Sequence, residues 1–241
     1  MIRVRVFRSA DALARALAED VARRLETIPS LVLGLPTGRT PIPFYHELVR
    51  LYRAGRADFS RVTTFNLDEF AGIDPTDPRS YRAFMQRHLF DHVNVAPPRI
   101  HFLNGAAADA GRECARYERA IARAGGIDLQ ILGLGLNGHI GFNEPGRALI
   151  ARTHCTRLKP ASRHANAALF DNRIRAVPRE ALSMGMATIL QARGIVLIAT
   201  GASKTRCVQR MMEGPVTPRL PASFLQLHGN AEAWLDRAAA G

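Results

Sequence analysis

The sequence predicts an α/β fold, with a mostly parallel sheet in a single domain. Short apolar or β-branched runs alternate with longer helical stretches, which is typical of βαβ units. The segment IDLQILGLG, residues 127–135, is a continuous apolar run, as expected for a central parallel strand covered on both faces. No repeat, low-complexity tract or linker divides the 241 residues, so we expect one domain over 1–241.

The individual elements follow from local signals. Strands are expected at 2–7, 31–35, 62–66, 99–103, 128–134 and 195–199, and helices at 11–25, 40–55, 80–93, 109–126, 179–191 and 203–214. In the second helix Thr40 is the expected N-cap, Pro41 lies in the first turn and Gly55 ends the helix. Residues 67–70 are expected to be a loop, and 232–240 are compatible with either a helix or a strand.

The charge pattern argues against several protein classes. The net charge is +12, but the arginines are spread along the chain without a basic run, so we expect anionic metabolites rather than nucleic acid as partners. Neither a membrane span nor a signal peptide is expected, which favours a cytoplasmic protein without membrane contact. The three cysteines are widely separated, so they predict neither a metal site nor a redox pair.

Four loops with unusual residues follow four expected strands. They are GLPTGRTP after 31–35, NLDEF after 62–66, GLNGHIGFNEPG after 128–134 and TGASK after 195–199. Ligands of open α/β sheets bind outside the carboxyl ends of the strands. We therefore expect the four loops to converge on one cleft.

Two of these loops have features of an anion site. GLPTGRTP enters a helix N-terminus, where free N–H groups favour an anion, although an ordinary strand–helix turn fits equally well. Only Lys159 and Lys204 are lysines among 33 basic residues. Lys204 is expected in the first turn of a helix, where a cation is disfavoured unless an anion lies between, so we expect it to contact phosphate.

The other two loops carry acid–base groups. His139 alone would more often be structural, but Glu144 is placed to accept its second N–H, which would define the tautomer and raise the basicity. Asp68 and Glu69 are adjacent and point in different directions, so at most one should enter the cleft. A helix-cap or turn role is the common use of such an acidic pair.

The motifs together resemble the glucosamine-6-phosphate deaminase family. The resemblance rests on GLPTG-TP, FNLDEF, LGLGLNGHIGFNEPG, LFDN…VP..ALSMGMATIL and LQLH, and it covers about residues 1–237. It implies a doubly wound, Rossmann-like α/β fold, and that no metal or organic cofactor is needed. It also implies that Asp68 is the general base at the sugar C2, and that His139, Glu144 and Asn137 open the pyranose ring, with Asn137 in a supporting role because an amide cannot take up a proton. Phosphate-site positions fall on Thr37, Gly38, Thr40 and Lys204.

The reaction implied by this resemblance converts glucosamine 6-phosphate and water to fructose 6-phosphate and ammonia. A homo-oligomer is compatible with the resemblance. Three alternatives stay open: a galactosamine-6-phosphate deaminase, a 6-phosphogluconolactonase on the same fold, and a phosphosugar-sensing domain without catalysis.

Two positions depart from the family pattern. Arg39 replaces the second glycine of the first loop, and Ala168 stands where the family has an arginine for the substrate phosphate. We interpret the two changes as a pair, in which Arg39 binds the phosphate from the opposite side. Arg163 or Arg173 could also supply the missing charge.

Overall fold

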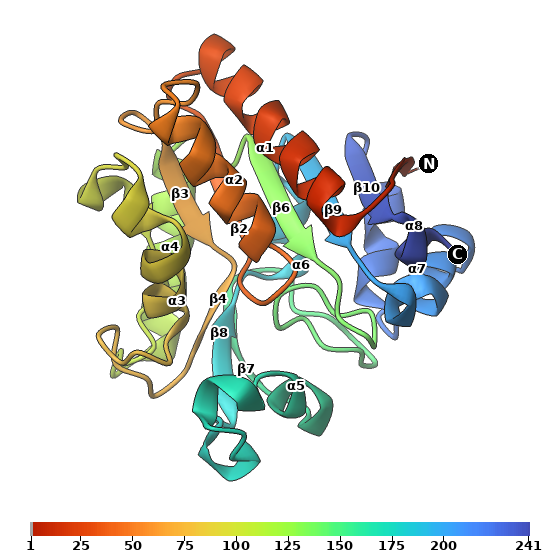
Figure 1. Cartoon of the computed structure of the whole chain (residues 1–241). Coiled ribbons are helices and arrows are strands. Elements are labelled where there is room, and N and C mark those ends of the chain that lie inside the picture. Colours follow the sequence, from red (N-terminus) through yellow and green to blue (C-terminus); the bar gives the residue numbers. More distant parts are fainter. Residues whose placement is uncertain (1) are drawn as a thin grey trace.

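Seven parallel strands form the central sheet of the computed structural model, which describes residues 2–241 (Figure 1). In spatial order they are β1 (Arg3–Phe7), β10 (Ala231–Asp236), β9 (Gly194–Ala199), β6 (Leu129–Gly133), β2 (Val32–Leu35), β3 (Thr63–Asn66) and β5 (Ile100–His101). From β2 the chain moves outward to β3 and β5, whereas from β6 it moves outward to β9 and β10. The strand order therefore reverses between β2 and β6, which is where open α/β sheets bind ligands.

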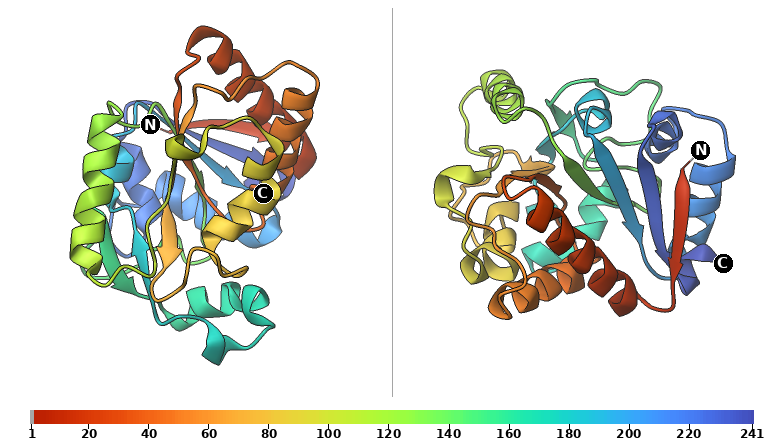
Figure 2. Two further views of the ribbon diagram at one scale, coloured as in Figure 1. Left: turned by 90° about the vertical axis from the view of Figure 1, so that its left-hand side faces the viewer. Right: turned by 90° about the horizontal axis from the view of Figure 1, so that it is seen from above.

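Helices cover both faces of this sheet, as a doubly wound fold requires (Figure 2). One face packs against α1 (Ala10–Thr27), α2 (Ile42–Arg53) and α3 (Tyr81–His88), and the other against α4 (Ala110–Arg123), α6 (Met186–Leu190) and α7 (Thr205–Glu213). The short helices α5 (Pro160–Ala165) and α8 (Arg237–Ala240) complete the set.

The apolar run of β6 explains this two-sided packing. Leu129 and Ile131 belong to the core under α1 and α2, whereas Leu132 belongs to the core under α4 and α7. Successive side chains of a strand point to opposite faces, so a strand buried on both faces must be apolar throughout. The α/β class and the central position of this strand are thus confirmed.

A second, antiparallel sheet was not predicted. It consists of β4 (Asp68–Phe70), β8 (Glu180–Ser183) and β7 (His154–Arg157). Two predictions are therefore wrong: residues 68–70 form a strand instead of a loop, and the helix expected over 179–191 is a strand followed by the short helix α6. Each strand here has only three or four residues, and its hydrogen-bond partners come from distant parts of the chain, so local periodicity could not reveal it.

The helix boundaries also differ in places. Pro41 occupies the N-cap position of α2 without a side-chain cap hydrogen bond, so Thr40 is not the cap. The helix expected over 80–93 ends at His88 and is followed by a 3₁₀ turn over Phe90–His92. Residues 232–240 contain both a strand and a helix, because β10 pairs with β1 and β9 and Asp236 then caps α8.

Among the helices of residues 2–241, none combines the length with the apolar character that a membrane crossing demands.

Candidate active site

The four loops predicted to meet follow four neighbouring strands of the central sheet. These strands are β9, β6, β2 and β3, which lie side by side in this order. Because all four are parallel, their carboxyl ends share one edge of the sheet (Figure 1). The loops after β2 and β6 flank the point at which the strand order reverses.

Asp68 lies against the loop that carries His139. Asp68 pairs with Ser183 across the sheet of β4, β8 and β7, and the Asp68 side chain is buried. A methyl group added at Gly141, which has a φ of 55°, would lie 3.4 Å from Asp68 Oδ2 and 3.1 Å from Ser183 Oγ. Glycine at position 141 therefore lets the loop approach the carboxyl group closely.

Burial changes the protonation of both acidic neighbours. Burial, and then the negative charge of Glu69, raise the pKa of Asp68 to about 8. Burial also raises the pKa of Glu69 to about 7, against the lowering effect of the N–H groups of Phe70, Tyr81 and Arg82 and the charge of Arg82. Asp68 therefore holds a proton in a substantial part of the molecules at neutral pH.

The carboxylate of Glu69 has a different structural role from that of Asp68. Its Oε1 accepts the N–H groups of Phe70 (2.9 Å) and Tyr81 (3.0 Å), and its Oε2 accepts that of Arg82 (3.0 Å). The carboxylate thus satisfies the free N–H groups of the first turn of α3. Of the acidic pair, Glu69 is the helix-cap acid, and only Asp68 lies against Gly141.

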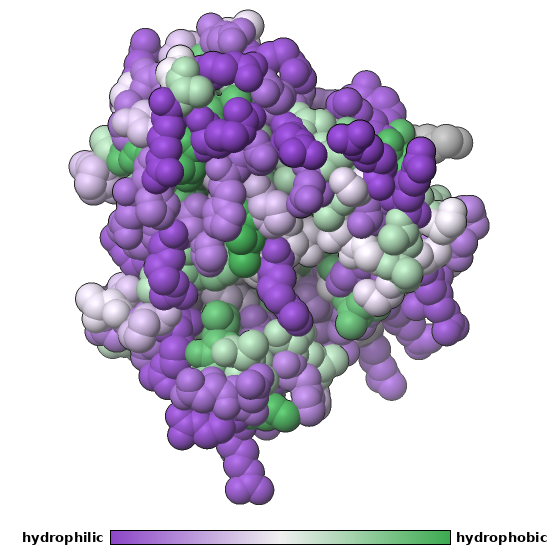
Figure 3. Space-filling view, in the orientation of Figure 1, coloured by the Kyte–Doolittle hydropathy of each residue, from purple (hydrophilic) through white to green (hydrophobic). Residues whose placement is uncertain are grey.

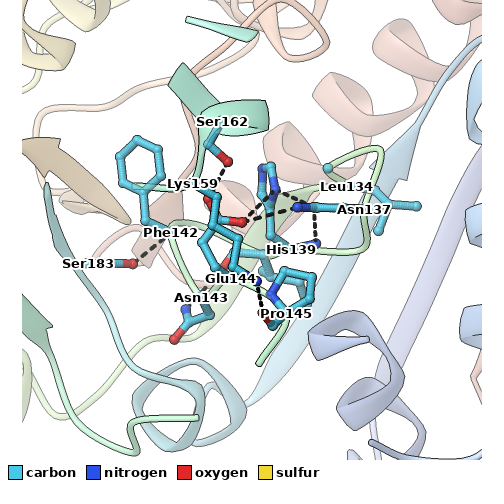
Figure 4. Close-up of polar contacts among 12 residues, drawn as sticks. Leu134, Asn137, His139, Phe142, Asn143, Glu144, Pro145, Lys159, Ser162 and Ser183 are labelled. Carbon is cyan, nitrogen blue, oxygen red and sulfur yellow. Dashed lines mark hydrogen bonds and ion pairs between the residues drawn. The ribbon is translucent and has the colours of Figure 1, made fainter. Parts of the chain in front are cut away.

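The ring of His139 is hydrogen-bonded to the amide of Asn137, and the carboxylate of Glu144 lies farther from it (Figure 4). Its Nδ1 lies 2.7 Å from Asn137 Oδ1 and 3.9 Å from Glu144 Oε2. Asn137 Nδ2 in turn donates to Glu144 Oε2 at 3.1 Å. The prediction that Glu144 accepts the second N–H of His139 is therefore wrong, because the amide of Asn137 lies between the two groups.

This chain of contacts defines the tautomer of His139. The backbone N–H of His139 also donates to Asn137 Oδ1 (3.2 Å), so this atom must be the amide oxygen. An oxygen opposite Nδ1 requires a proton on Nδ1, which leaves Nε2 as the basic atom. Burial lowers the pKa of His139 most; the charge of Glu144 raises it and that of Lys204 lowers it. The imidazole is thus a neutral base at neutral pH.

The Glu144 end of the loop is tied to α5. Ser162 donates to Glu144 Oε1, and Lys159 donates to the carbonyl oxygen of Pro145 (Figure 4). Phe142 anchors the middle of the loop, because its ring stacks on Tyr81 with centroids 5.9 Å apart. The loop is therefore held along its length, although glycine makes its backbone permissive.

Lys204 lies close to the same loop at its other end. It precedes α7, and its Nζ donates to the carbonyl oxygen of Leu134 at 2.5 Å. Burial lowers its pKa. The two lysines of the chain thus contact the two ends of one loop, Lys204 before its start and Lys159 near its end.

The loop after β2 presents the other predicted anion-binding residues. Thr37 and Thr40 are half-buried, whereas Gly38 and Arg39 are exposed. The hydroxyl group of the buried Tyr45 donates to the carbonyl oxygen of Pro36 and holds the start of this loop.

Besides Arg39, the arginines Arg163 and Arg173 are candidates to replace the one that the family has at position 168. Ala168 lies exposed in a 3₁₀ turn. Arg163 donates to the carbonyl oxygens of Ile174 (2.6 Å) and Val177 (3.0 Å), and Arg173 pairs with Asp171 at 2.9 Å. The guanidinium groups of Arg163 and Arg173 are therefore already engaged.

Three residues at this site were not predicted from the sequence: Lys159, Ser162 and Tyr81. The scarcity of lysine singles out Lys159 as it does Lys204, so a signal for it existed. Ser162 and Tyr81 carry no such signal, because their contacts to Glu144 and Asn166 bridge 18 and 85 residues. Within residues 2–241, no three His, Cys, Asp or Glu side chains are grouped so that they could hold a metal ion.

Comparison with known proteins shows the family of this chain. A family model described as glucosamine-6-phosphate isomerases/6-phosphogluconolactonase matches residues 8–234. A glucosamine-6-phosphate deaminase of Clostridium perfringens is 44% identical over 239 residues, which cover 99% of this chain and 98% of the relative. That of Halothermothrix orenii is 48% identical over 220 residues, 91% of each chain.

Solved structures give the same picture. A monomeric glucosamine-6-phosphate deaminase superposes with a TM-score of 0.95 at 40% identity and covers 99% of both chains. A 6-phosphogluconolactonase of Trypanosoma brucei superposes with a TM-score of 0.75 at 20% identity, covering 100% of this chain and 98% of the other. The second likeness concerns the fold alone.

Proposed function

The chain belongs to the family of glucosamine-6-phosphate isomerases and 6-phosphogluconolactonases, and from this premise we propose that it is a glucosamine-6-phosphate deaminase. It converts glucosamine 6-phosphate and water to fructose 6-phosphate and ammonia. The observation that carries the proposal is Asp68, a buried carboxyl group with a raised pKa beside the loop of His139. Deamination needs a carbon-acid base of this kind, whereas hydrolysis of a lactone does not.

The first step is the opening of the sugar ring. A proton must leave the anomeric hydroxyl group and another must reach the ring oxygen, and a neutral imidazole can accept the first and then donate the second. Nε2 of His139 is the atom that exchanges these protons. Asn137 keeps the proton on Nδ1, and Glu144 orients the amide of Asn137.

The second step moves a proton from C2 to C1. Ionised Asp68 removes the C2 hydrogen of the open-chain aldehyde, and the resulting enolate takes up a proton at O1, which gives an enolamine. Return of the first proton from Asp68 to C1, with loss of a proton from the amino nitrogen, gives a ketimine. Water then adds to C2 of the ketimine and ammonia leaves, so that one water is consumed for each ammonia released.

The phosphate group anchors the sugar for both steps. We assign it to Thr37, Gly38, Arg39 and Thr40 in the loop after β2 and to Lys204 before α7. These two loops follow strands on either side of β6, which carries the His139 loop. Anchoring at one end of the sugar lowers the entropic cost of placing C1 and C2 at the catalytic groups.

Comparing three substrates tests the proposal. Glucosamine 6-phosphate, galactosamine 6-phosphate and 6-phosphogluconolactone are supplied separately, and ammonia, ketose phosphate and lactone consumption are followed. Ammonia from glucosamine 6-phosphate is the expected result. Ammonia from the galactosamine epimer alone, lactone hydrolysis, or binding without turnover would each replace the proposal by the corresponding alternative.

The same proposal extends to partners and location. The partner is a small sugar phosphate, no organic cofactor or metal takes part, and the enzyme works in the cytoplasm. Sedimentation at micromolar concentration distinguishes a homo-oligomer from a monomer such as the solved deaminase of 40% identity.

The pH dependence follows from the buried acid. We expect kcat/KM to fall as the pH drops below about 8, by about tenfold per pH unit at the acidic limit, because the base must be ionised in the free enzyme. Glu69→Gln removes a negative charge that raises the pKa of Asp68, so it should move this limb to lower pH. The measurement is kcat/KM from about pH 5.5 to 9.5. The control is the pKa of the free sugar, measured by NMR. If the acidic limb lies at the same pH in Glu69→Gln as in the wild type, its assignment to Asp68 is wrong.

The phosphate site gives a prediction for Arg39. Arg39→Gly should raise KM for glucosamine 6-phosphate at least about tenfold, since a charge-assisted hydrogen bond to phosphate is lost. Arg163→Gln is not a suitable control, because the guanidinium group of Arg163 donates to the carbonyl oxygens of Ile174 and Val177. Arg8→Gly removes the same charge ahead of α1 and should leave KM unchanged. An unaltered KM in Arg39→Gly would refute the role of Arg39.

A further inference from the structure

A second group of cations lines a pocket of about 330 Å³ between α2 and the end of α3. Its walls are formed by His46, Val49, Arg50 and Arg53 of α2, and by Arg87 and His92 beyond them. No acidic side chain is among these lining residues. Figure 3 shows that hydrophilic residues dominate the surface over α1, α2 and α3.

The helical repeat gathers these cations. Positions 46, 49, 50 and 53 are spaced i, i+3, i+4 and i+7, so they occupy one face of α2. Val49 is buried and forms the apolar floor, whereas Arg50 and Arg53 are exposed. The sequence therefore places exposed, positively charged side chains around a buried apolar floor.

The charges of the pocket are only partly neutralised. Arg50 pairs with Glu47 at 2.7 Å and lies 3.9 Å from Glu19. Arg87 donates to the carbonyl oxygen of Pro78 at 2.7 Å, a neutral partner. His92 Nε2 lies 2.9 Å from the carbonyl oxygen of Arg87, again without an acid. Excess positive charge therefore remains across two separate elements.

A helix-dipole role explains part of this cluster but not all of it. Arg50 and Arg53 lie in the last turn of α2, where cations favourably oppose the partial negative charge of the helix end. Arg87 and His92 belong to other elements and bring their charge toward α2. A role in capping α2 gives no reason for their presence in the same pocket.

The pKa of His88 responds to the charges of these groups. Its ring lies 4.5 Å from that of Phe84 and 5.7 Å from that of His46, measured between centroids. Burial lowers the pKa of His88 most, and the charges of His46, Arg87 and His92 lower it further. An anion in the pocket would oppose this second effect.

We propose that this pocket binds a small polyanion, such as a phosphorylated metabolite with two or more negative charges. Guanidinium groups match the geometry of phosphate oxygens, and Arg50, Arg53 and Arg87 approach from two sides. The site is separate from the proposed active site, because its lining begins at His46, about one turn after the start of α2, and extends away from the phosphate loop to Arg53, roughly 16 Å along the helix. It does not depend on the proposed reaction.

Titration with inorganic pyrophosphate tests the proposal. The C2 protons of His46, His88 and His92 are followed by NMR, with sodium chloride at equal ionic strength as the reference. Saturable shifts and a raised pKa of His88 are expected. Shifts that do not saturate, or that sodium chloride reproduces, would overturn the proposal.

Variants separate this site from the active site. Arg53→Gln/Arg87→Gln should weaken the binding reported by His88 by about tenfold or more. Lys204→Gln should leave the His88 titration unchanged, although it removes a proposed active-site phosphate ligand. Arg123→Gln/Arg157→Gln, which removes equal charge at exposed positions elsewhere, is the matched control. Equal affinity in the pocket variant and this control would show that only the overall charge attracts the anion.

Discussion

Asp68→Asn is expected to lower kcat for glucosamine 6-phosphate by about 10²–10⁴-fold, with KM within about threefold of the wild-type value. The reason is chemical: an amide cannot accept the C2 proton. The carboxyl group is buried, and its pKa of about 8 means that it is largely protonated at neutral pH, so a neutral amide of similar shape should be tolerated by the fold.

Two measurements separate this loss from a general defect. Sugar deuterated at C2 should show no exchange of its label with water in Asp68→Asn, because the step that breaks the C2 bond is missing. Circular dichroism and thermal unfolding should match the wild type. Asp11→Asn, which removes an exposed acid from the first turn of α1, should keep full activity. Normal label exchange in Asp68→Asn would show that another group is the base.

Gly135→Ala is expected to lower kcat/KM by about 10²-fold or more, although it removes no titratable group. A methyl group at this position would lie 2.3 Å from Cε1 and Nδ1 of His139, far inside van der Waals contact. The imidazole must therefore move away from Asn137, and with it the contact that defines its tautomer is lost.

Gly133→Ala is the matched control for this prediction. It is the same substitution two residues earlier, and a methyl group there meets no atom within 4 Å. We expect its kcat/KM to lie within about threefold of the wild-type value. If Gly135→Ala were as active as Gly133→Ala, His139 could not be the group that opens the ring.

The central sheet and its carboxyl-end loops were predictable because their signals are local. The strand β6 can be predicted from its apolar run alone, because a strand covered on both faces needs apolar side chains throughout. The rule that ligands bind at the carboxyl ends of parallel strands predicted that the four segments share one edge, whereas the adjacency of β9, β6, β2 and β3 is known only from the structure. The family motifs singled out His139 and Asp68, although Asp68 begins the strand β4 and does not lie in a loop.

The arrangement inside the site was only partly predictable. The sequence offers two acids, Asp68 and Glu69, but their division of labour depends on α3, whose N–H groups occupy Glu69. Likewise, Asn137 and Glu144 are both within reach of His139 along the chain. The amide lies next to the ring because the loop folds back on itself and Ser162 of α5 holds Glu144.

By itself, the sequence determined the α/β class, the buried central strand β6 and the types of residue that follow four of the strands. These properties depend on the polarity and shape of residues that are neighbours in the chain. The tertiary structure alone decided the small sheet of β4, β8 and β7, the contact of Asp68 with Gly141 and the amide between His139 and Glu144. Each of these requires a partner whose position is set by packing and hydrogen bonding across the fold, and such pairings leave no periodic trace in either segment.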